Sequence, residues 1–151
     1  MKPFVFFDPG RLRDGDLTLT LHETVPAFAG RAPCYRFHMR RGAELQKIGR
    51  IELRLANTTE ILLYAGHIGY NVDQSHRGHR FAARATTLLY PLARQHGFTE
   101  IWITCDPDNL PSKRTCELVG GEFISEVPVP EDHPFFKAGS TAKLRYRVKL
   151  D

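Results

Sequence analysis

Gln74-Ser75-His76-Arg77-Gly78-His79-Arg80-Phe81-Ala82-Ala83-Arg84 is the stretch of sequence around which the other segments are arranged. It follows an apolar run that ends at Val72, and it opens a segment in which apolar residues recur at helical spacing. The pattern predicts a strand, a tight basic loop and the start of a helix. Such a junction points unpaired backbone N–H groups and the positive end of a helix dipole in one direction, which favours an anion site.

Positive charge is concentrated in the same part of the chain. Residues 74–99 contain four arginines, three histidines and no carboxylate. The chain has 21 Lys and Arg against 17 Asp and Glu, so its formal surplus of 4 equals the charge of this one segment. A nucleic-acid site usually draws charge from several elements, so one basic loop favours a compact anion such as a phosphorylated cofactor. For Arg94 alone, a solvated helix face is the better interpretation.

The composition is that of a globular protein, and we expect residues 1–151 to form a single domain. Cys34, Cys105 and Cys116 are an odd number without CxxC spacing, which argues against a disulfide framework or a zinc site and favours a reducing compartment. The apolar start is interrupted at residues 8–10, too early for a signal sequence, and no run is long enough to span a bilayer. We therefore expect a cytoplasmic protein without a membrane partner.

The order of the apolar patterns predicts an α/β (α+β) fold with one mixed, mostly antiparallel sheet of about seven strands and helices packed on it. The expected elements are strands at 17–22, 35–39, 46–56 and 61–72, a helix from 81 to a stop at 96–97 that is bent at Pro91, a strand at 101–105, a helix at 111–119, and strands at 122–127 and 144–150. Short connections between the first strands favour an antiparallel meander. A helix of crossover length joins the fourth and fifth strands, so we expect these two to be parallel.

Two motifs resemble the GNAT superfamily of N-acetyltransferases. Residues 77–82, Arg-Gly-His-Arg-Phe-Ala, are similar to the family's cofactor loop Q/R-x-x-G-x-G/A, except that Arg80 stands where a glycine is usual. Residues 109–120 are similar to the family's asparagine, small residue and short helix that ends in glycine. The two motifs follow each other in the family's order with a strand between them, and they cover roughly the second half of the chain.

The resemblance implies a cleft for acetyl-CoA where the fourth and fifth strands splay apart. Backbone groups of the fourth strand would bind the pantetheine arm, and the amides that follow Arg77 would bind the pyrophosphate. The second motif would add two polar side chains. The cofactor-binding residues expected on this basis are Tyr70, Asn71, Val72, Arg77, Gly78, His79, Arg80, Phe81, Ala82, Asn109 and Ser112. The resemblance implies no metal.

The same resemblance suggests residues for the chemistry. Attack of an amine on a thioester needs a route for the ammonium proton and often an acid for the leaving thiolate. His67 is the candidate base, with a histidine that is hydrogen-bonded inside the sheet as the alternative. Cys116 stands where the family often has a tyrosine acid, and packing on an apolar face is its alternative. Tyr64, Tyr70 and Tyr146 are substitutes among which the sequence does not choose.

The implied activity is transfer of an acetyl group from acetyl-CoA to a primary amine of a small molecule or a protein, by direct attack in a ternary complex. Residues 23–33 are too short and too rich in proline to form the helices that wall the family's acceptor pocket. The acceptor would then be bordered by residues 1–16, by residues 131–137 or by a second subunit of a homodimer, and Glu52 or Glu60 could attract a cationic amine. A non-catalytic acyl-CoA-binding domain is the first alternative. A basic nucleic-acid-binding module is the second, although a nucleic-acid partner is not expected.

Overall fold

The computed structural model describes residues 4–150 of the chain. The elements in order are β1 (Leu12–Asp14), β2 (Leu17–Val25), β3 (Cys34–Arg41), β4 (Gln46–Arg54), the wide helical turn η1 (Ile61–Ala65), β5 (Ile68–Val72), the short turn η2 (Gln74–His76), α1 (Phe81–Leu88), α2 (Tyr90–Gln95), β6 (Glu100–Cys105), α3 (Leu110–Leu118), β7 (Glu122–Pro128), α4 (Pro134–Lys137) and β8 (Ala142–Lys149). Within the described residues, no helix is long and apolar enough to cross a bilayer.

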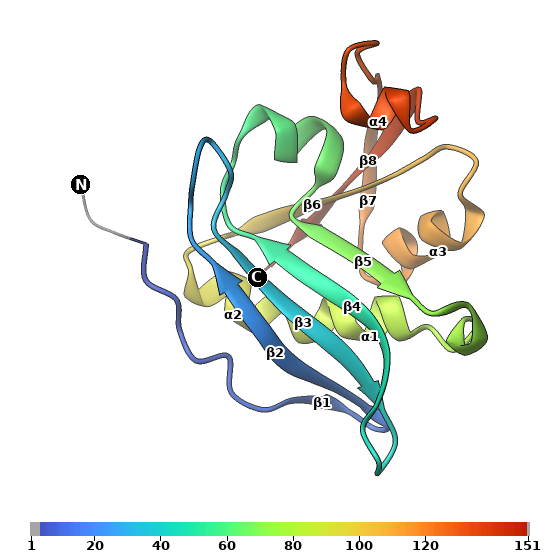
Figure 1. The fold of residues 1–151 in the computed structure, drawn as a ribbon. Coiled ribbons are helices and arrows are strands. Elements are labelled where there is room, and N and C mark those ends of the chain that lie inside the picture. Colours follow the sequence, from blue (N-terminus) through green and yellow to red (C-terminus); the bar gives the residue numbers. More distant parts are fainter. Residues whose placement is uncertain (1–3, 151) are drawn as a thin grey trace.

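The five-stranded sheet, in the order β1-β2-β3-β4-β5, is covered on one face only. Figure 1 shows α1 and α2 behind this sheet, while the other face has no helix on it. Period-two alternation along β2, β3 and β4 turns buried apolar residues toward the helices and polar residues away from them. The buried set from these strands and α1 includes Leu17, Leu19, Tyr35, Phe37, Met39, Ile48, Ile51, Leu53, Phe81 and Ala85.

The expectation of one sheet of about seven strands is wrong. The described strands form a five-stranded sheet and a separate three-stranded sheet in the order β6-β8-β7, and each ladder is antiparallel. The fourth and fifth predicted strands were expected to be parallel and splayed apart; within residues 4–150 no ladder joins β5 to β6, so they form no parallel pair. The sheets meet where the His67 N–H donates to the Trp102 carbonyl over 2.7 Å and the Trp102 N–H donates to His67 Nδ1 over 2.8 Å. From this point β5 and β6 diverge (Figure 1).

The predicted fourth strand, residues 61–72, is longer than the strand that forms. Its first part forms the helical turn η1, and only Ile68–Val72 is extended as β5. Leucine and alanine favour helix, and a short apolar run does not distinguish a strand from a buried helical turn. Thr58 holds the turn, because its hydroxyl accepts from the Ile61 N–H over 3.2 Å and its carbonyl accepts from the Leu62 N–H over 2.9 Å.

The bend predicted at Pro91 is confirmed. The helix that begins at Phe81 ends at Leu88, and α2 starts at Tyr90 with the proline in its first turn, where the missing N–H would have had no partner. Two short elements, β1 and α4, were not predicted, since three and four residues show no periodicity.

Gly66 allows the two sheets to approach each other. Its φ of 73° and ψ of 171° lie in a region that only glycine occupies readily, and a Cβ there would lie 2.9 Å from the Trp102 carbonyl oxygen. The contact between His67 and Trp102 therefore depends on the absence of a side chain at this position.

Gly66→Ala should lower the free energy of unfolding by more than about 2 kcal/mol, because it adds backbone strain and a collision with Trp102. Gly97→Ala is the matched control: φ is 88° there, but no atom lies within 4 Å of the new Cβ. Only the strain, about 1 kcal/mol, should appear in the control. Urea unfolding of both variants measures the difference, and equal losses would contradict the close approach.

Candidate active site

A groove of about 560 Å³ lies between β5, the loop before α1, and α3. It brings together the cofactor residues expected from the sequence, with the exception of His79. The lining residues are Tyr70, Asn71, Val72, His76, Arg77, Gly78, Arg80, Phe81, Ala82, Asn109, Pro111, Ser112, Arg114, Thr115 and Leu118. Arg114 was missed because helical spacing placed it on the outer face of α3. The other lining residues that were not expected are His76, Pro111, Thr115 and Leu118.

The start of α1 presents backbone donors to this groove. The bond from the Arg84 N–H to the Arg80 carbonyl, 2.9 Å, is the first that fits the helical ladder, so the amides of Phe81, Ala82 and Ala83 precede it. Among the described residues, no acceptor outside the helix receives a hydrogen bond from the amides of residues 78–82. An open helix N-terminus of this kind favours a negatively charged group.

Arg80 has a left-handed backbone conformation, with φ 60° and ψ 25°. This conformation costs an L-residue about 1 kcal/mol or more and costs glycine little, which explains why the related loop motif has glycine at this position. Gly78 also has a positive φ, 92°. The loop therefore keeps the sharp turn of the motif although one glycine is replaced, and the exposed Arg80 side chain lies at the groove.

The arginines of the basic segment have different partners. Arg84 is held by the acidic turn between β1 and β2: its Nε donates to Asp14 Oδ2 and its Nη2 donates to Asp16 Oδ1, each over 2.7 Å. The hydrogen bond from Arg84 lowers the pKa of Asp16. Arg77 donates from Nε to the Val72 carbonyl over 2.9 Å. Arg84 therefore stabilises the fold, while Arg77 and Arg80 leave positive charge at the groove.

Polar side chains link β5 to α3 across the groove. The Tyr70 hydroxyl and Ser112 Oγ lie 2.7 Å apart, and burial raises the pKa of Tyr70. Asn109 caps α3, because its Oδ1 accepts from the Ser112 N–H over 3.2 Å. Asn109 thus has a structural role as the cap of α3, and it also lines the groove.

The imidazole of His67 is fully buried, and both of its ring nitrogens have partners. Nδ1 accepts from the Trp102 N–H, so the proton is on Nε2, which donates to Asn57 Oδ1 over 2.9 Å. Burial lowers the pKa of His67 to about 4. This geometry supports the structural alternative, because no ring nitrogen is free to accept a proton from a substrate amine.

Cys116 is also buried, and it lines neither of the two grooves described here. Contact with the Cys105 thiol and burial raise the pKa of the Cys116 thiol. A thiol in this environment packs in the core beneath α3 and has no path to a leaving group in the groove. The geometry supports the packing alternative for Cys116.

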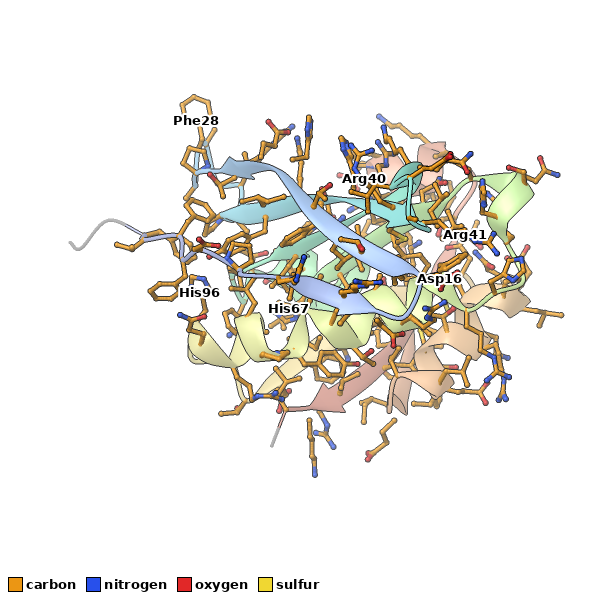
Figure 2. All side chains as sticks on the ribbon, turned by 90° about the horizontal axis from the view of Figure 1, so that it is seen from below. Asp16, Phe28, Arg40, Arg41, His67 and His96 are labelled. Atoms are coloured by element: carbon orange, nitrogen blue, oxygen red, sulfur yellow. The ribbon has the colours of Figure 1, made fainter. Side chains whose placement is uncertain are left out.

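A second groove, about 690 Å³, crosses the bare face of the five-stranded sheet. Figure 2 shows this face from the edge, with Arg40 on the side away from α1 and α2. The lining residues are His22, Glu23, Arg36, Phe37, His38, Lys47, Arg50, Ile51, Glu52, Arg54, Gly69, Tyr70 and Asn71. Tyr70 and Asn71 line both grooves, so the two sites meet at β5.

The acceptor walls suggested by the sequence do not border this groove. Residues 131–137 and the described part of residues 1–16 are absent from its lining, and residues 1–3 lie outside the described chain. Glu60 is paired with His133 Nε2 over 2.8 Å. Glu52 is paired with Arg54 over 2.6 Å and with Arg36 over 3.2 Å. Neither carboxylate is therefore available to attract a cationic amine.

Comparison with known families places this fold and groove in one class. The model of the Acetyltransferase (GNAT) domain matches residues 10–122, which is most of the sequence. The chain belongs to the GNAT acetyltransferase family. A sequence search of curated proteins finds no match.

Solved structures show the same fold at low sequence identity. The ribosomal-protein-S5-alanine acetyltransferase of Vibrio fischeri is 17% identical with a TM-score of 0.62, and the match covers 78% of this chain and 62% of that one. RimL, a ribosomal L7/L12 α-N-protein acetyltransferase in complex with coenzyme A, is 16% identical with a TM-score of 0.61, covering 78% and 63%. RimJ of Mycobacterium smegmatis, in complex with a CoA-disulfide, is 18% identical with a TM-score of 0.60, covering 80% and 54%. The chain spans less than two thirds of the length of these proteins.

The buried His67 should make the protein less stable as the pH falls. Its pKa is about 4 in the native state and 6.5 in the unfolded chain, so between these values only the unfolded chain binds the proton. The free energy of unfolding should therefore fall by up to about 1.4 kcal/mol per pH unit from pH 6.5 toward 4.

His67→Gln should remove this slope, and the exposed His79→Gln is the control that should keep it. Urea unfolding at a series of pH values measures the slope. If His67→Gln and the wild type have the same pH dependence, the histidine titrates normally and becomes a candidate base again.

Proposed function

We propose that the protein transfers the acetyl group of acetyl-CoA to a primary amine, of a small molecule or a protein, by direct attack in a ternary complex. The observation that supports this most strongly is the meeting of two grooves at Tyr70 and Asn71. One groove offers backbone donors and positive charge, as a diphosphate requires, and the other is open to an acceptor. Family membership supplies the reaction class.

The first groove fits coenzyme A by its chemistry. The unpaired amides at the start of α1 would hold the pyrophosphate, with the guanidinium groups of Arg77, Arg80 and Arg114 around it. The edge of β5 at Asn71 and Val72 would bind the pantetheine amides as a further strand does. When bound, acetyl-CoA supplies a thioester whose carbonyl carbon is attacked by the amine.

Tyr70 is the residue we propose as the acid for the leaving thiolate. It lies at the junction of the two grooves, and burial raises its pKa, so the hydroxyl holds its proton until a thiolate forms. The neutral amine nitrogen forms a bond to the carbonyl carbon, the carbon–sulfur bond breaks and the phenol proton moves to sulfur, while the nitrogen releases its second proton to water to give the neutral amide. Ser112 Oγ, 2.7 Å away, positions the hydroxyl and restores its proton from solvent.

Water is the base that we propose for the ammonium proton. His67 has no free nitrogen, and the charges of Arg54 and Arg36 outweigh burial and lower the pKa of Glu52. A carboxylate that binds protons less readily than usual is a weak base. The second groove is open to solvent, so the proton can leave through water.

The alternatives to an enzyme have less support from the structure. A nucleic-acid module would use the basic segment as a charged surface, but Arg84 is paired with Asp14 and Asp16. A domain that only senses acyl-CoA would need no acceptor groove beside the thioester, yet the second groove shares Tyr70 and Asn71 with the first. A single domain, a cytoplasmic location and a homodimer stay predictions.

The loop before α1 should determine the affinity for acetyl-CoA. Arg77→Glu combined with Gly78→Val should weaken acetyl-CoA binding by more than about a hundredfold, since it adds a negative charge, blocks the loop and removes a positive-φ glycine. Arg94→Glu makes the same charge reversal on the exposed far end of the segment and should bind normally. Isothermal calorimetry measures both, and unchanged affinity in the double variant would overturn the placement of the pyrophosphate.

Tyr70 should affect the rate of acetyl transfer more than the binding of acetyl-CoA. Tyr70→Phe should lower kcat by about a hundredfold, the usual contribution of a general acid, while the Kd for acetyl-CoA changes little. Cys116→Ala should retain most of the wild-type kcat, because the thiol is remote from the groove. Release of free thiol during turnover with a panel of amines provides the rate, and an inverse pattern would make Cys116 the acid.

A further inference from the structure

The bare face of the five-stranded sheet carries two rows of residues. The charged residues of one row are paired with each other, and those of the other row are not. The paired row consists of Glu23, Arg36, Glu52 and Gly69, which lie opposite one another on β2, β3, β4 and β5. The cationic row consists of His38, Arg50 and Asn71, opposite one another on β3, β4 and β5, with Lys47 beside it on β4. Both rows lie in the second groove.

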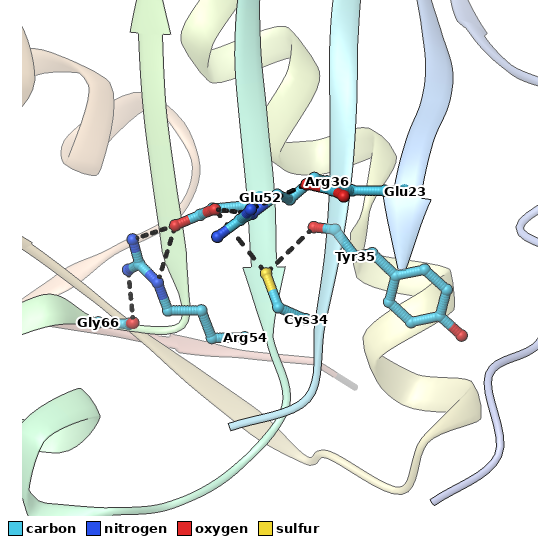
Figure 3. A network of polar contacts seen from close by, with 7 residues as sticks. All are labelled: Glu23, Cys34, Tyr35, Arg36, Glu52, Arg54 and Gly66. Carbon is cyan, nitrogen blue, oxygen red and sulfur yellow. Dashed lines mark hydrogen bonds and ion pairs between the residues drawn. The ribbon is translucent and has the colours of Figure 1, made fainter. Parts of the chain in front are cut away.

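The charges of the paired row neutralise each other. Arg36 bridges Glu23 over 2.8 Å and Glu52 over 3.2 Å, and Arg54 adds a second guanidinium to Glu52 over 2.6 Å (Figure 3). Arg54 also donates to the Gly66 carbonyl over 3.1 Å, which fixes its guanidinium over β5. The row is therefore a rigid, neutral border on one side of the groove.

The cationic row has no such compensation. Among the described residues, no carboxylate pairs with Lys47 or Arg50, and both side chains are exposed. The pKa of His38 is lowered by burial and then by the charges of Lys47, His22 and Arg40, which is the effect of a positive potential at this place. An anion bound to this row would gain Coulombic attraction without displacing a carboxylate that is already paired there.

The position of Arg50 relates this row to the reaction. Arg50 is the ladder partner of Asn71, so their Cα atoms are about 5 Å apart, and Asn71 is at the junction of the two grooves. A group bound to Arg50 would thus be within one or two residues of an amine that reaches the junction. The groove crosses four strands, or about 14 Å, which is the length of about four extended residues.

We infer that this row selects the acceptor, and that the acceptor is the amino terminus of a polypeptide with an acidic side chain at its second or third residue. The inference rests on the proposed acetyltransfer and names its substrate class. The terminal amine lies at the junction beside Tyr70, the acidic side chain lies on Arg50, and the next residues pass over Lys47 toward the open end of the groove. A single-stranded nucleic acid fits less well, because the border of the groove contains the carboxylates Glu23 and Glu52, which repel a phosphate backbone.

Two tetrapeptide amides that differ only in charge, Ser-Asp-Asp-Ala and Ser-Asn-Asn-Ala, test the inference with the full chain and acetyl-CoA. The acidic peptide should have a KM lower by about fivefold or more at low salt, with similar kcat, and the difference should shrink as salt screens it. Arg50→Gln should reduce the ratio between the two peptides toward one. Arg94→Gln, which removes the same charge from α2, should leave the ratio unchanged.

Equal KM values for the two peptides would overturn the inference while acetyltransfer itself stands. A free amino acid such as aspartate acetylated in preference to the acidic peptide would also overturn it. Fluorescence anisotropy of the labelled peptides measures binding without turnover, so the inference is tested even if no peptide is acetylated and the proposed function fails. Displacement of the acidic peptide by a lower concentration of single-stranded RNA would make the face a nucleic-acid site and the inference wrong.

Discussion

The contact between His67 and Trp102 is the constraint on which the remaining structure depends. The backbone N–H of each residue donates a hydrogen bond to the other residue, which joins β5 to β6. The buried imidazole also donates to Asn57. Gly66 lacks the Cβ that would separate the strands here. Since the sheets are joined at one end of β5 and diverge beyond it, the edge of β5 stays open, and the groove forms along this edge.

The positive charge of the first groove depends on which arginines are paired with carboxylates. Arg84 forms ion pairs with Asp14 and Asp16, so this part of the basic segment's charge stabilises the packing of α1 against the β1–β2 turn. Arg77 and Arg80 remain at the groove. On the bare face of the five-stranded sheet, carboxylates neutralise Arg36 and Arg54, whereas none within residues 4–150 pairs with Arg50. In both places the unpaired cations lie beside β5, where the two grooves meet.

The second groove is walled by strands of the five-stranded sheet. The segment between β2 and β3 makes only a short connection, so the polar face of the sheet is itself the wall of the second groove. Regular cross-strand register then sets the spacing of the charged groups, and each lies about 5 Å from its neighbour on the next strand. A surface of this kind is rigid, which favours selection of an acceptor by charge.

The sequence by itself determined the junction of strand, basic loop and helix, because these features depend on residue type and short-range period. Together with the family resemblance, it also indicated most of the residues that line the first groove. Only the tertiary structure decided that Arg84 meets Asp14, that His67 is locked by Trp102, and that Glu52 is neutralised. Partners that are distant in the sequence are chosen by packing, which local periodicity does not record: Arg84 and Asp14 are 70 residues apart, and His67 and Trp102 are 35 residues apart. The division into two sheets has the same cause, since strand patterns look alike whichever strand they pair with.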